Sequence, residues 1–295
     1  MCTLSIITPT YNRAAYLERC FQSLQRQTCM DFEWIIVDDG SSDNTAEVVS
    51  AFRPEQFTLQ FVQKKNGGKH TALNASHPYI HGKYVLILDS DDYLTDTAVE
   101  EVLVAWAKYE QNEKIGVVTF LRGTPDLKPL CVVDDYDQPV DLMRYKRHRI
   151  VSSDCCEVIR TDLFKRYPFP EYANERFVAE CALWNRVSFT HECIYRNSVI
   201  YICEYLAGGL TDSGRKMRVR NPKGGLFTSN LRMDRKNFFL QRVKYGLLYS
   251  CYGFFANMPV SKLIRDSCAP LLTVSCLPGG YIIYRRWKRV FLIED

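Results

Sequence analysis

Four consecutive residues carry the clearest chemical signal of this chain: Asp89, Ser90, Asp91 and Asp92. They follow residues 84–88, a short apolar run of the kind that forms a buried strand. Carboxylates at the end of a strand can hold a hard divalent cation through oxygen, and that cation can bind a diphosphate. A purely structural interpretation stays open for the quartet alone, because Asp91 or Asp92 could instead cap a following helix.

Apolar, β-branched runs alternate with helical patterns across the first 120 residues. The first helical pattern, residues 14–27, places Leu17, Phe21 and Leu24 on one face. Such alternation predicts a mostly parallel sheet covered by helices. The strands are expected at residues 4–8, 34–37, 58–62, 84–88 and 115–120, and later ones at 155–159 and as a strand pair within 193–205.

Polar loops follow the first four predicted strands. Turn formation explains each loop alone, because Gly, Asn, Asp and Ser are common turn residues. In open parallel sheets, however, ligands bind beyond the carboxyl ends of the strands. Four such loops at one edge therefore predict a binding site, formed by residues 9–13, 38–43, 66–69 and 89–92.

These motifs resemble family 2 glycosyltransferases, which have the GT-A fold. The resemblance is strong over the first 100 residues and extends more weakly to about residue 212. It rests on residues 5–13 (SIITPTYNR), 33–43 (EWIIVDDGSSD), 66–69 (NGGK) with Ala72 and Asn74, and Asp89-x-Asp91.

The resemblance implies an α/β, Rossmann-like GT-A sheet flanked by helices. Residues 1–212 would form the catalytic domain, with the nucleotide-sugar in 1–115 and the acceptor in 116–212. Residues 213–295 would form a basic loop and a C-terminal helical extension, for which we expect helices at roughly 229–255 and 261–274.

The resemblance also implies a nucleotide-sugar donor, most often UDP-linked, that binds with Mg²⁺ or Mn²⁺. Asp91 would be the main metal ligand, and Asp89 would face the ribose or the metal. The other donor-site residues implied by position are Thr8, Tyr11 and Arg13 around the nucleotide, Asp39 and then Asp38 at the base, Lys69 at the base or diphosphate, and Ser90 beside them.

Transfer with inversion needs a carboxylate that removes the acceptor proton. Glu180 is the candidate, since it precedes Leu183-Trp184 much as the acidic motif of the family does, and Glu175 is the reserve. Many family members carry Glu-Asp where this chain has Glu180-Cys181. A structural role as a residue favoured by the helix dipole remains the alternative for Glu180, and Trp184 could either stack on a sugar or fill the core.

Two basic segments follow. Arg215 to Lys223, between the glycine pairs 208–209 and 224–225, is interpreted as a mobile loop that either closes over the diphosphate or is simply solvated. Residues 281–289 interleave aromatics with cations, which favours contact with an anionic membrane surface and a lipid-linked acceptor.

Composition and residue spacing disfavour several other classes of protein and site. A net charge of +4 over 295 residues does not favour nucleic-acid binding, and the twelve cysteines lack zinc or disulfide spacing, which indicates reduced thiols. Pro78 disfavours a metal site joining His77 and His81. The absence of a signal peptide pattern and of a spanning run predicts a cytoplasmic protein. Residues 281–289 favour peripheral contact with the inner face of the cell membrane.

The resemblance thus implies a metal-dependent, inverting glycosyltransferase that adds one sugar to a saccharide or lipid-linked acceptor, and it alone implies a setting in bacterial surface polysaccharide or glycolipid assembly. The Gln-x-x-Arg-Trp motif of processive synthases is incomplete, with only Arg286-Trp287 present. The alternative is an inactive nucleotide-binding module within a synthesis complex. A nucleotidyltransferase is disfavoured because residues 8–13 contain no glycine.

Overall fold

A computed structural model describes residues 2–131, 133, 138–141, 155–203 and 210–291. The chain forms two compact units: unit 1 comprises Met1–Pro168 and Thr190–Tyr205, and unit 2 comprises Phe169–Phe189 and Leu206–Asp295. Each is described by itself. The functional division at residue 212 stays a prediction.

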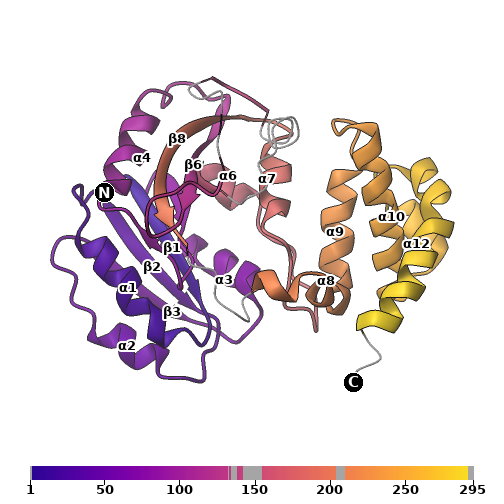
Figure 1. Cartoon of the computed structure of the whole chain (residues 1–295), viewed down its shortest axis with the longest axis horizontal. Helices are drawn as coiled ribbons and strands as arrows, with labels where there is room; N and C mark the ends of the chain where they lie inside the picture. The colour runs from indigo at the N-terminus through magenta and orange to yellow at the C-terminus, as the bar shows by residue number, and fades with distance from the viewer. Residues whose placement is uncertain (1, 132, 134–137, 142–154, 204–209, 292–295) are drawn as a thin grey trace. The chain divides into compact units, whose positions relative to one another are not determined.

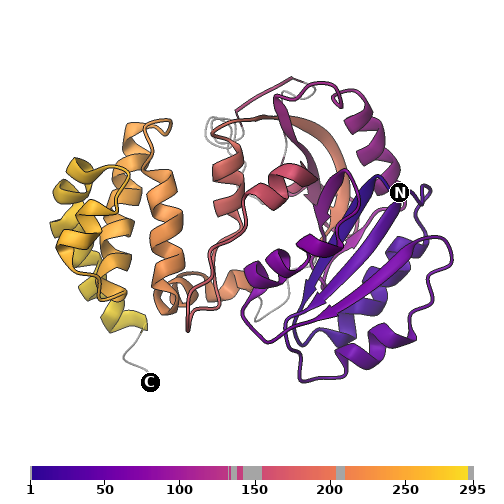
Figure 2. The same cartoon turned by 180° about the vertical axis from the view of Figure 1, so that it is seen from behind.

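Unit 1 is a curled sheet with helices around it, seen from the two sides in Figure 1 and Figure 2. This confirms the predicted α/β sheet flanked by helices. Its elements are β1 (Leu4–Thr10), α1 (Ala14–Gln25), β2 (Phe32–Asp38), α2 (Thr45–Ala51), β3 (Thr58–Gln63), α3 (Lys69–Ala75), the short 3-10 helix η1 (His77–Tyr79), β4 (Tyr84–Ile87), β5 (Tyr93–Leu94), α4 (Ala98–Ala107), β6 (Ile115–Gly123), β7 (Cys156–Arg160), α6 (Thr161–Arg166) and β8 (Glu192–Ile202).

The strand order is β3-β2-β1-β4-β7-β6-β8-β5 within the described residues. The first four strands are parallel neighbours, as the alternation predicts. β7 runs antiparallel to both β4 and β6, and β8 is parallel to β6. The strand pair expected within residues 193–205 is wrong, because β8 is one continuous strand of 11 residues that follows β6 along its length.

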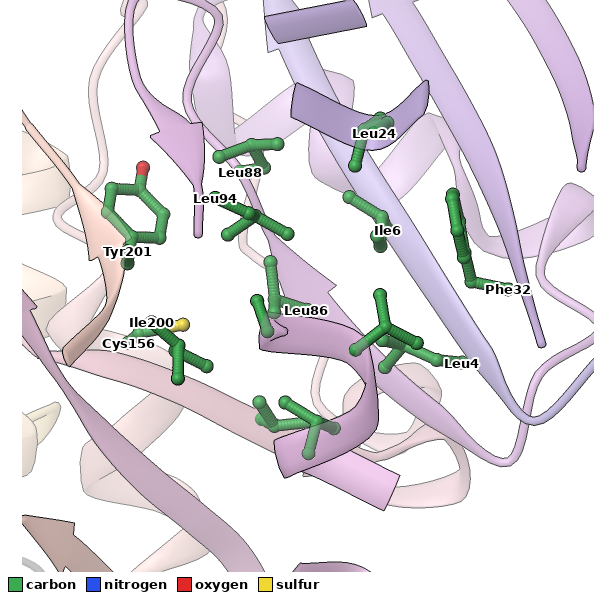
Figure 3. Packing of buried hydrophobic residues seen from close by; sticks show 14 of the residues in the cluster. Leu4, Ile6, Leu24, Phe32, Leu86, Leu88, Leu94, Cys156, Ile200 and Tyr201 are labelled. Carbon is green, nitrogen blue, oxygen red and sulfur yellow. The ribbon is translucent and has the colours of Figure 1, made fainter. Parts of the chain in front are cut away.

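Apolar side chains from these strands and helices pack together as the core of unit 1. Every residue of β1 and β2 is buried, as expected for strands covered on both faces. The Phe21 ring of α1 stacks on Phe52 with centroids 4.4 Å apart, next to Trp34 of β2. Figure 3 shows part of this cluster, including Ile6, Leu86 and Tyr201.

Unit 2 is helical. Its elements are α7 (Cys181–Val187), α8 (Leu210–Arg220), α9 (Pro222–Arg232), α10 (Phe239–Phe255), α11 (Val260–Arg265) and α12 (Pro270–Phe291). α9, α10 and α12 lie side by side in both views (Figure 1, Figure 2). The predicted helical extension is thus confirmed. Its boundaries differ, because a turn after Met233 separates α9 from α10, and α12 continues through Pro278.

Small residues allow the helices of unit 2 to approach closely. A side chain at Gly246 would meet the Cys276 sulfur at 2.8 Å, and one at Gly280 would collide with Ser250. Tyr249 donates its hydroxyl hydrogen to the Leu263 carbonyl at 3.0 Å, which fastens α11 to α10. Within the described residues, no helix combines the length and the apolar character that a bilayer crossing needs.

Candidate functional site

The carboxyl ends of β1, β2, β3 and β4 carry the four polar loops that the sequence singled out. Because these strands are parallel neighbours, Thr10 pairs with Asp38 and Asp38 pairs with Gln63 at the same edge. The convergence of the loops is confirmed, and hydrogen bonds and ion pairs link each loop to the next. We call this edge of unit 1 the donor edge.

Asn12 joins the first loop to the second. Its backbone N–H donates to the Ser41 hydroxyl at 2.9 Å, and its side-chain oxygen accepts from the Ser42 N–H at 2.8 Å. Asn12 has φ of 51°, a left-handed conformation that asparagine tolerates better than most residues. Asp38 holds the same turn, because its carboxylate accepts from the Ser41 N–H at 2.9 Å.

Asp39 joins the second loop to the third. Its buried carboxylate accepts from the backbone N–H groups of Gly67 (2.9 Å) and Gly68 (2.6 Å), and Lys64 Nζ lies 2.8 Å away. Gly68 has φ of 96°, which favours glycine. Asp39 thereby fixes the loop immediately before α3, the helix that begins at Lys69.

Two cations connect the acidic quartet to the other loops. Lys69 Nζ lies 2.5 Å from Asp89 Oδ1, and Arg13 Nε lies 3.7 Å from Asp91 Oδ2. Burial alone would raise the pKa of Asp89, but the charges of Lys69 and Arg122 outweigh it and hold this pKa below the ordinary value. Asp89 is therefore ionised at neutral pH.

Two further residues reach the quartet from the other half of the sheet. Tyr201 of β8 accepts a hydrogen bond from the Asp89 N–H at 2.9 Å and donates its own hydroxyl hydrogen to Asp92 Oδ2 at 2.8 Å. The Arg122 guanidinium of β6 lies over the Tyr201 ring at 4.2 Å and 3.8 Å from both Asp89 and Asp92. Figure 3 shows the Tyr201 hydroxyl directed away from Ile200 and Cys156.

The sequence argument missed Arg122 and Tyr201. A signal existed for Arg122, because it stands near the end of β6, and the strand-end rule was applied only to the first four strands. No local signal marks Tyr201, which lies 112 residues from Asp89. Only the pairing of β8 with β6 and β5 brings it to the quartet.

Asp92 has a structural environment that differs from those of its neighbours. Burial and the nearby Asp89 charge raise the pKa of Asp92 to about 7, although the hydrogen bond from Tyr201 acts in the opposite direction. Asp91 and Asp92 do not cap a helix, so the helix-cap interpretation is wrong. β5 follows the quartet, and α4 begins only at Ala98.

Substituting Tyr201 with phenylalanine should loosen the quartet. The Asp89 N–H and the Asp92 carboxylate lose a common partner, and a buried hydrogen-bonding group left without one costs about 1–3 kcal/mol. We expect the free energy of unfolding to fall by that amount and nucleotide affinity to fall about tenfold. Denaturant unfolding and calorimetry measure the two changes. Tyr195→Phe, an equally buried change on β8, should leave nucleotide affinity unaltered, and an equal loss in both variants would refute the assignment.

Asp91 is the residue predicted to bind a divalent cation. Its side chain is 27% exposed, and Arg13 at 3.7 Å is beyond hydrogen-bonding distance. No group of three or more His, Cys, Asp or Glu side chains among the described residues is arranged to hold an ion. A cation at Asp91 would thus take other ligands from a diphosphate and water, as Mg²⁺ does in many nucleotide sites.

The other predicted donor-site residues differ in exposure. Tyr11 is exposed, whereas Ser90 is buried. Thr8 is fully buried, and its hydroxyl accepts a hydrogen bond from the Trp34 indole at 2.9 Å. Their contacts with a nucleotide stay predictions.

The two candidate bases lie in unit 2 and have different surroundings. Glu175 accepts hydrogen bonds from the backbone N–H groups of Lys223 (2.9 Å) and Gly224 (3.0 Å), so it satisfies the first turn of α9. Glu180 is partly buried and immediately precedes α7. Trp184 is 5% exposed, which favours the core-filling alternative for this residue.

The mobile basic loop expected at residues 215–223 is wrong, because residues 215–220 lie in α8 and residues 222–223 begin α9. The glycine pair at 208–209 lies outside the described residues. Gly224 and Gly225 are packing positions instead of hinges. A side chain at Gly224 would collide with the Phe177 carbonyl, and one at Gly225 would meet the Tyr252 ring at 2.8 Å. These two glycines therefore allow α9 to pack closely, a role that the glycine content alone does not reveal.

The histidines that suggested a metal site have other contacts. His81 Nδ1 lies 2.9 Å from Glu33 Oε2, on a carboxylate that also accepts from Ser5. Burial would raise the pKa of Glu33, but these hydrogen bonds outweigh it and lower that pKa. His77 packs its ring against Phe164.

Comparison with known proteins decides the family. The sequence profile of glycosyl transferase family 2 matches residues 5–166, which span β1 to α6 and contain the whole donor edge. The chain belongs to glycosyl transferase family 2. The resemblance seen in the sequence is thereby confirmed.

Curated relatives match this family 2 chain over part of their length. A chondroitin synthase of Pasteurella multocida is 42% identical over 105 residues, which are 36% of this chain and 11% of that protein. A chondroitin synthase of Escherichia coli is 29% identical over 172 residues, which are 58% of this chain and 24% of that protein. The chain thus spans a quarter or less of these relatives.

Solved structures confirm the fold of this family 2 chain over nearly its full length. S. aureus TarS 1–349 in complex with UDP-GlcNAc has a TM-score of 0.64 at 17% identity, covering 98% of this chain and 92% of that one. The mannosyltransferase PcManGT of Pyrobaculum calidifontis, in complex with GDP-Man and Mn²⁺, has a TM-score of 0.58 at 17% identity, covering 97% and 83%.

Proposed function

We propose that this chain transfers one sugar, with inversion, from a nucleotide-sugar to a saccharide or lipid-linked acceptor. The observation that carries the proposal is the donor edge, where four loops of a family 2 GT-A sheet are tied together around Asp89 and Asp91. A UDP-sugar is the proposed donor, since TarS and the glucosyl-3-phosphoglycerate synthase of Mycobacterium tuberculosis are described in complex with uridine nucleotides.

At the donor edge, each side chain has a task that its contacts support. Asp39 holds the loop of Gly67 and Gly68, and this loop with Tyr11 would enclose the base. Lys69 and Arg13 lie beside the quartet on the loops of the donor edge, and they would face the diphosphate. Asp38, Thr8 and Ser90 would support these contacts from the buried side.

Asp91, with Asp89 beside it, would hold Mg²⁺ or Mn²⁺. Bound there, the ion would stabilise the charge that develops on the leaving diphosphate. Arg122 and Tyr201 would keep the quartet in the required conformation, because they contact Asp89 and Asp92 and belong to strands of the same sheet. The ionised Asp89 would meet the ribose or the ion.

Glu180 is the proposed general base. It would take the proton of the acceptor hydroxyl as that oxygen attacks the anomeric carbon. Glu175 is the weaker candidate, because both of its carboxylate oxygens already accept from backbone N–H groups of α9. We therefore retain Glu175 in the proposal only as the residue that fixes the segment leading to Glu180.

The setting of the reaction is proposed from the relatives and from charge. The matched proteins include polysaccharide synthases, which supports a role in assembly of a surface polysaccharide or glycolipid. A lipid-linked acceptor would place the enzyme at the inner face of the membrane. The basic residues near the end of α12 support peripheral contact there.

Calorimetric titration with nucleotide diphosphates tests the proposal. We expect UDP to bind with about micromolar affinity in the presence of Mn²⁺, and at least tenfold more weakly after chelation, because the ion bridges carboxylate and diphosphate. GDP and CDP serve as controls for the base. Failure of all three nucleotides to bind would refute the donor site. Binding without any hydrolysis or transfer of a UDP-sugar would favour the inactive module.

A further inference from the structure

Helices α10 and α12 of unit 2 run side by side in the same direction. The Cys276 sulfur lies 3.8 Å from the Val243 carbonyl oxygen, and further along both helices the Phe254 ring lies 5.3 Å from that of Tyr281. The first turns of both helices therefore lie at the same end, as Figure 1 and Figure 2 show. That end includes Phe239 and Leu271.

Large apolar side chains are exposed at this end. Phe239 is 69% exposed, Leu240 81% and Leu271 86%, and Val274 one turn later is also exposed. Single exposed apolar residues are common on protein surfaces, but a group contributed by two helices marks an interaction site. We call these four residues the apolar tip.

An exposed stripe continues from the apolar tip along α12. Leu271, Pro278 and Ile282 recur at helical spacing and are followed by Arg285 and Arg289 on the same face. At 22 residues, α12 is about 33 Å long. The stripe is thus apolar in its first part and cationic in its last.

The exposed part of residues 281–289 is smaller than the sequence suggested. Tyr284 packs against Phe255 with centroids 4.7 Å apart, and Trp287 lies 6.1 Å from the Tyr252 ring. These two aromatics belong to the helix packing of unit 2. Ile282 and the cations remain on the surface.

Almost all charged residues in the sequence around the stripe are basic. Residues 235–291 contain ten lysines and arginines and one acid, Asp266. Asp266 is itself paired with Lys262 at 2.6 Å. A surface of this kind is complementary to an anionic lipid bilayer, whereas exposed Leu and Phe side chains suit the boundary between headgroups and acyl chains.

We propose that unit 2 docks on an anionic lipid bilayer, with the apolar tip entering the headgroup region and the cations of α12 contacting the lipid phosphates. The inference extends the membrane contact of the proposed function, on which it rests, to a defined surface of two helices. It needs no donor or acceptor. Vesicle binding and nucleotide binding can therefore fail separately.

Vesicle sedimentation of the full chain tests this surface. We expect binding to vesicles of phosphatidylglycerol and phosphatidylcholine in equal parts, and at least tenfold weaker binding to phosphatidylcholine alone or in high salt. The variant Phe239→Glu/Leu240→Glu should lose at least tenfold in bound fraction, and Arg285→Ser/Arg286→Ser should lose binding to a smaller degree. Val104→Glu, a 58% exposed valine on α4 of unit 1, is the matched control and should bind like wild type.

UDP titration of each variant shows that unit 1 is intact, and circular dichroism shows that the helices are retained. Equal sedimentation of wild type, Val104→Glu and Phe239→Glu/Leu240→Glu would overturn the proposal. It would also be overturned if the wild type bound no vesicles of either composition. The same holds if light scattering then shows a dimer that Leu271→Glu dissociates. In that case the surface binds a second copy of the chain.

Discussion

Replacing Asp91 with asparagine is expected to lower sugar transfer by a factor of about 10²–10³, the usual cost of removing one group that stabilises transition-state charge. Asparagine keeps the size of the side chain but removes the negative charge that would attract a divalent cation. Nucleotide affinity in the presence of Mn²⁺ should fall to the value measured after chelation. Transfer assays with a radiolabelled UDP-sugar and calorimetry measure the two effects.

The matched control for Asp91 is Asp96→Asn. Asp96 is an exposed carboxylate of the same unit whose partner is Arg26 at 3.1 Å, so its loss removes one charge without altering the quartet. Transfer by this variant should stay within about twofold of wild type, because an exposed ion pair contributes little. Equal rates for Asp91→Asn and wild type would exclude Asp91 as the metal ligand and move the proposal to Asp89.

Glu180→Gln should reduce the turnover number by a factor of about 10²–10⁴ and leave nucleotide affinity unchanged. The amide preserves the shape of the side chain but cannot accept the acceptor proton. Single-turnover transfer at saturating donor isolates this step. Binding of UDP in the presence of Mn²⁺ verifies that the donor edge is intact.

Glu175→Gln gives the contrasting result. Its carboxylate accepts from two backbone N–H groups at the start of α9, where a negative charge is favoured by the helix dipole. The amide keeps one acceptor oxygen, so we expect the free energy of unfolding to fall by about 1 kcal/mol while turnover changes little. A loss of turnover in Glu175→Gln that exceeds the loss in Glu180→Gln would identify Glu175 as the base.

Local patterns were sufficient for the first half of the fold. Strands such as β1 and β2 are short apolar runs, and α1 repeats its apolar residues at helical spacing, so each segment specifies its own conformation. The turn residues after each strand are equally local. Because parallel neighbouring strands end at one edge, their convergence followed from the alternation alone.

Unit 2 was harder to predict from sequence. Glycine and charge at residues 208–225 favour a loop in isolation, yet residues 215–220 lie in α8, and α9 begins at Pro222. Gly224 and Gly225 of α9 leave no room for a side chain beside Phe177 and Tyr252. Tertiary packing outweighed local propensity there. The hydrogen bonds of Glu175 to α9 likewise depend on a contact between segments 48 residues apart.

The sequence by itself determined the family, the four polar loops and the acidic quartet, because each of these motifs is formed by residues close together in the chain. Only the tertiary structure showed that Arg122 and Tyr201 fix the quartet, that Asp39 binds the glycine loop, and that an apolar tip is exposed beside the cations of α12. The physical reason is the same in each case. Burial, hydrogen bonding and exposure are set by which strands and helices become neighbours, and that choice is made by packing over long separations in sequence.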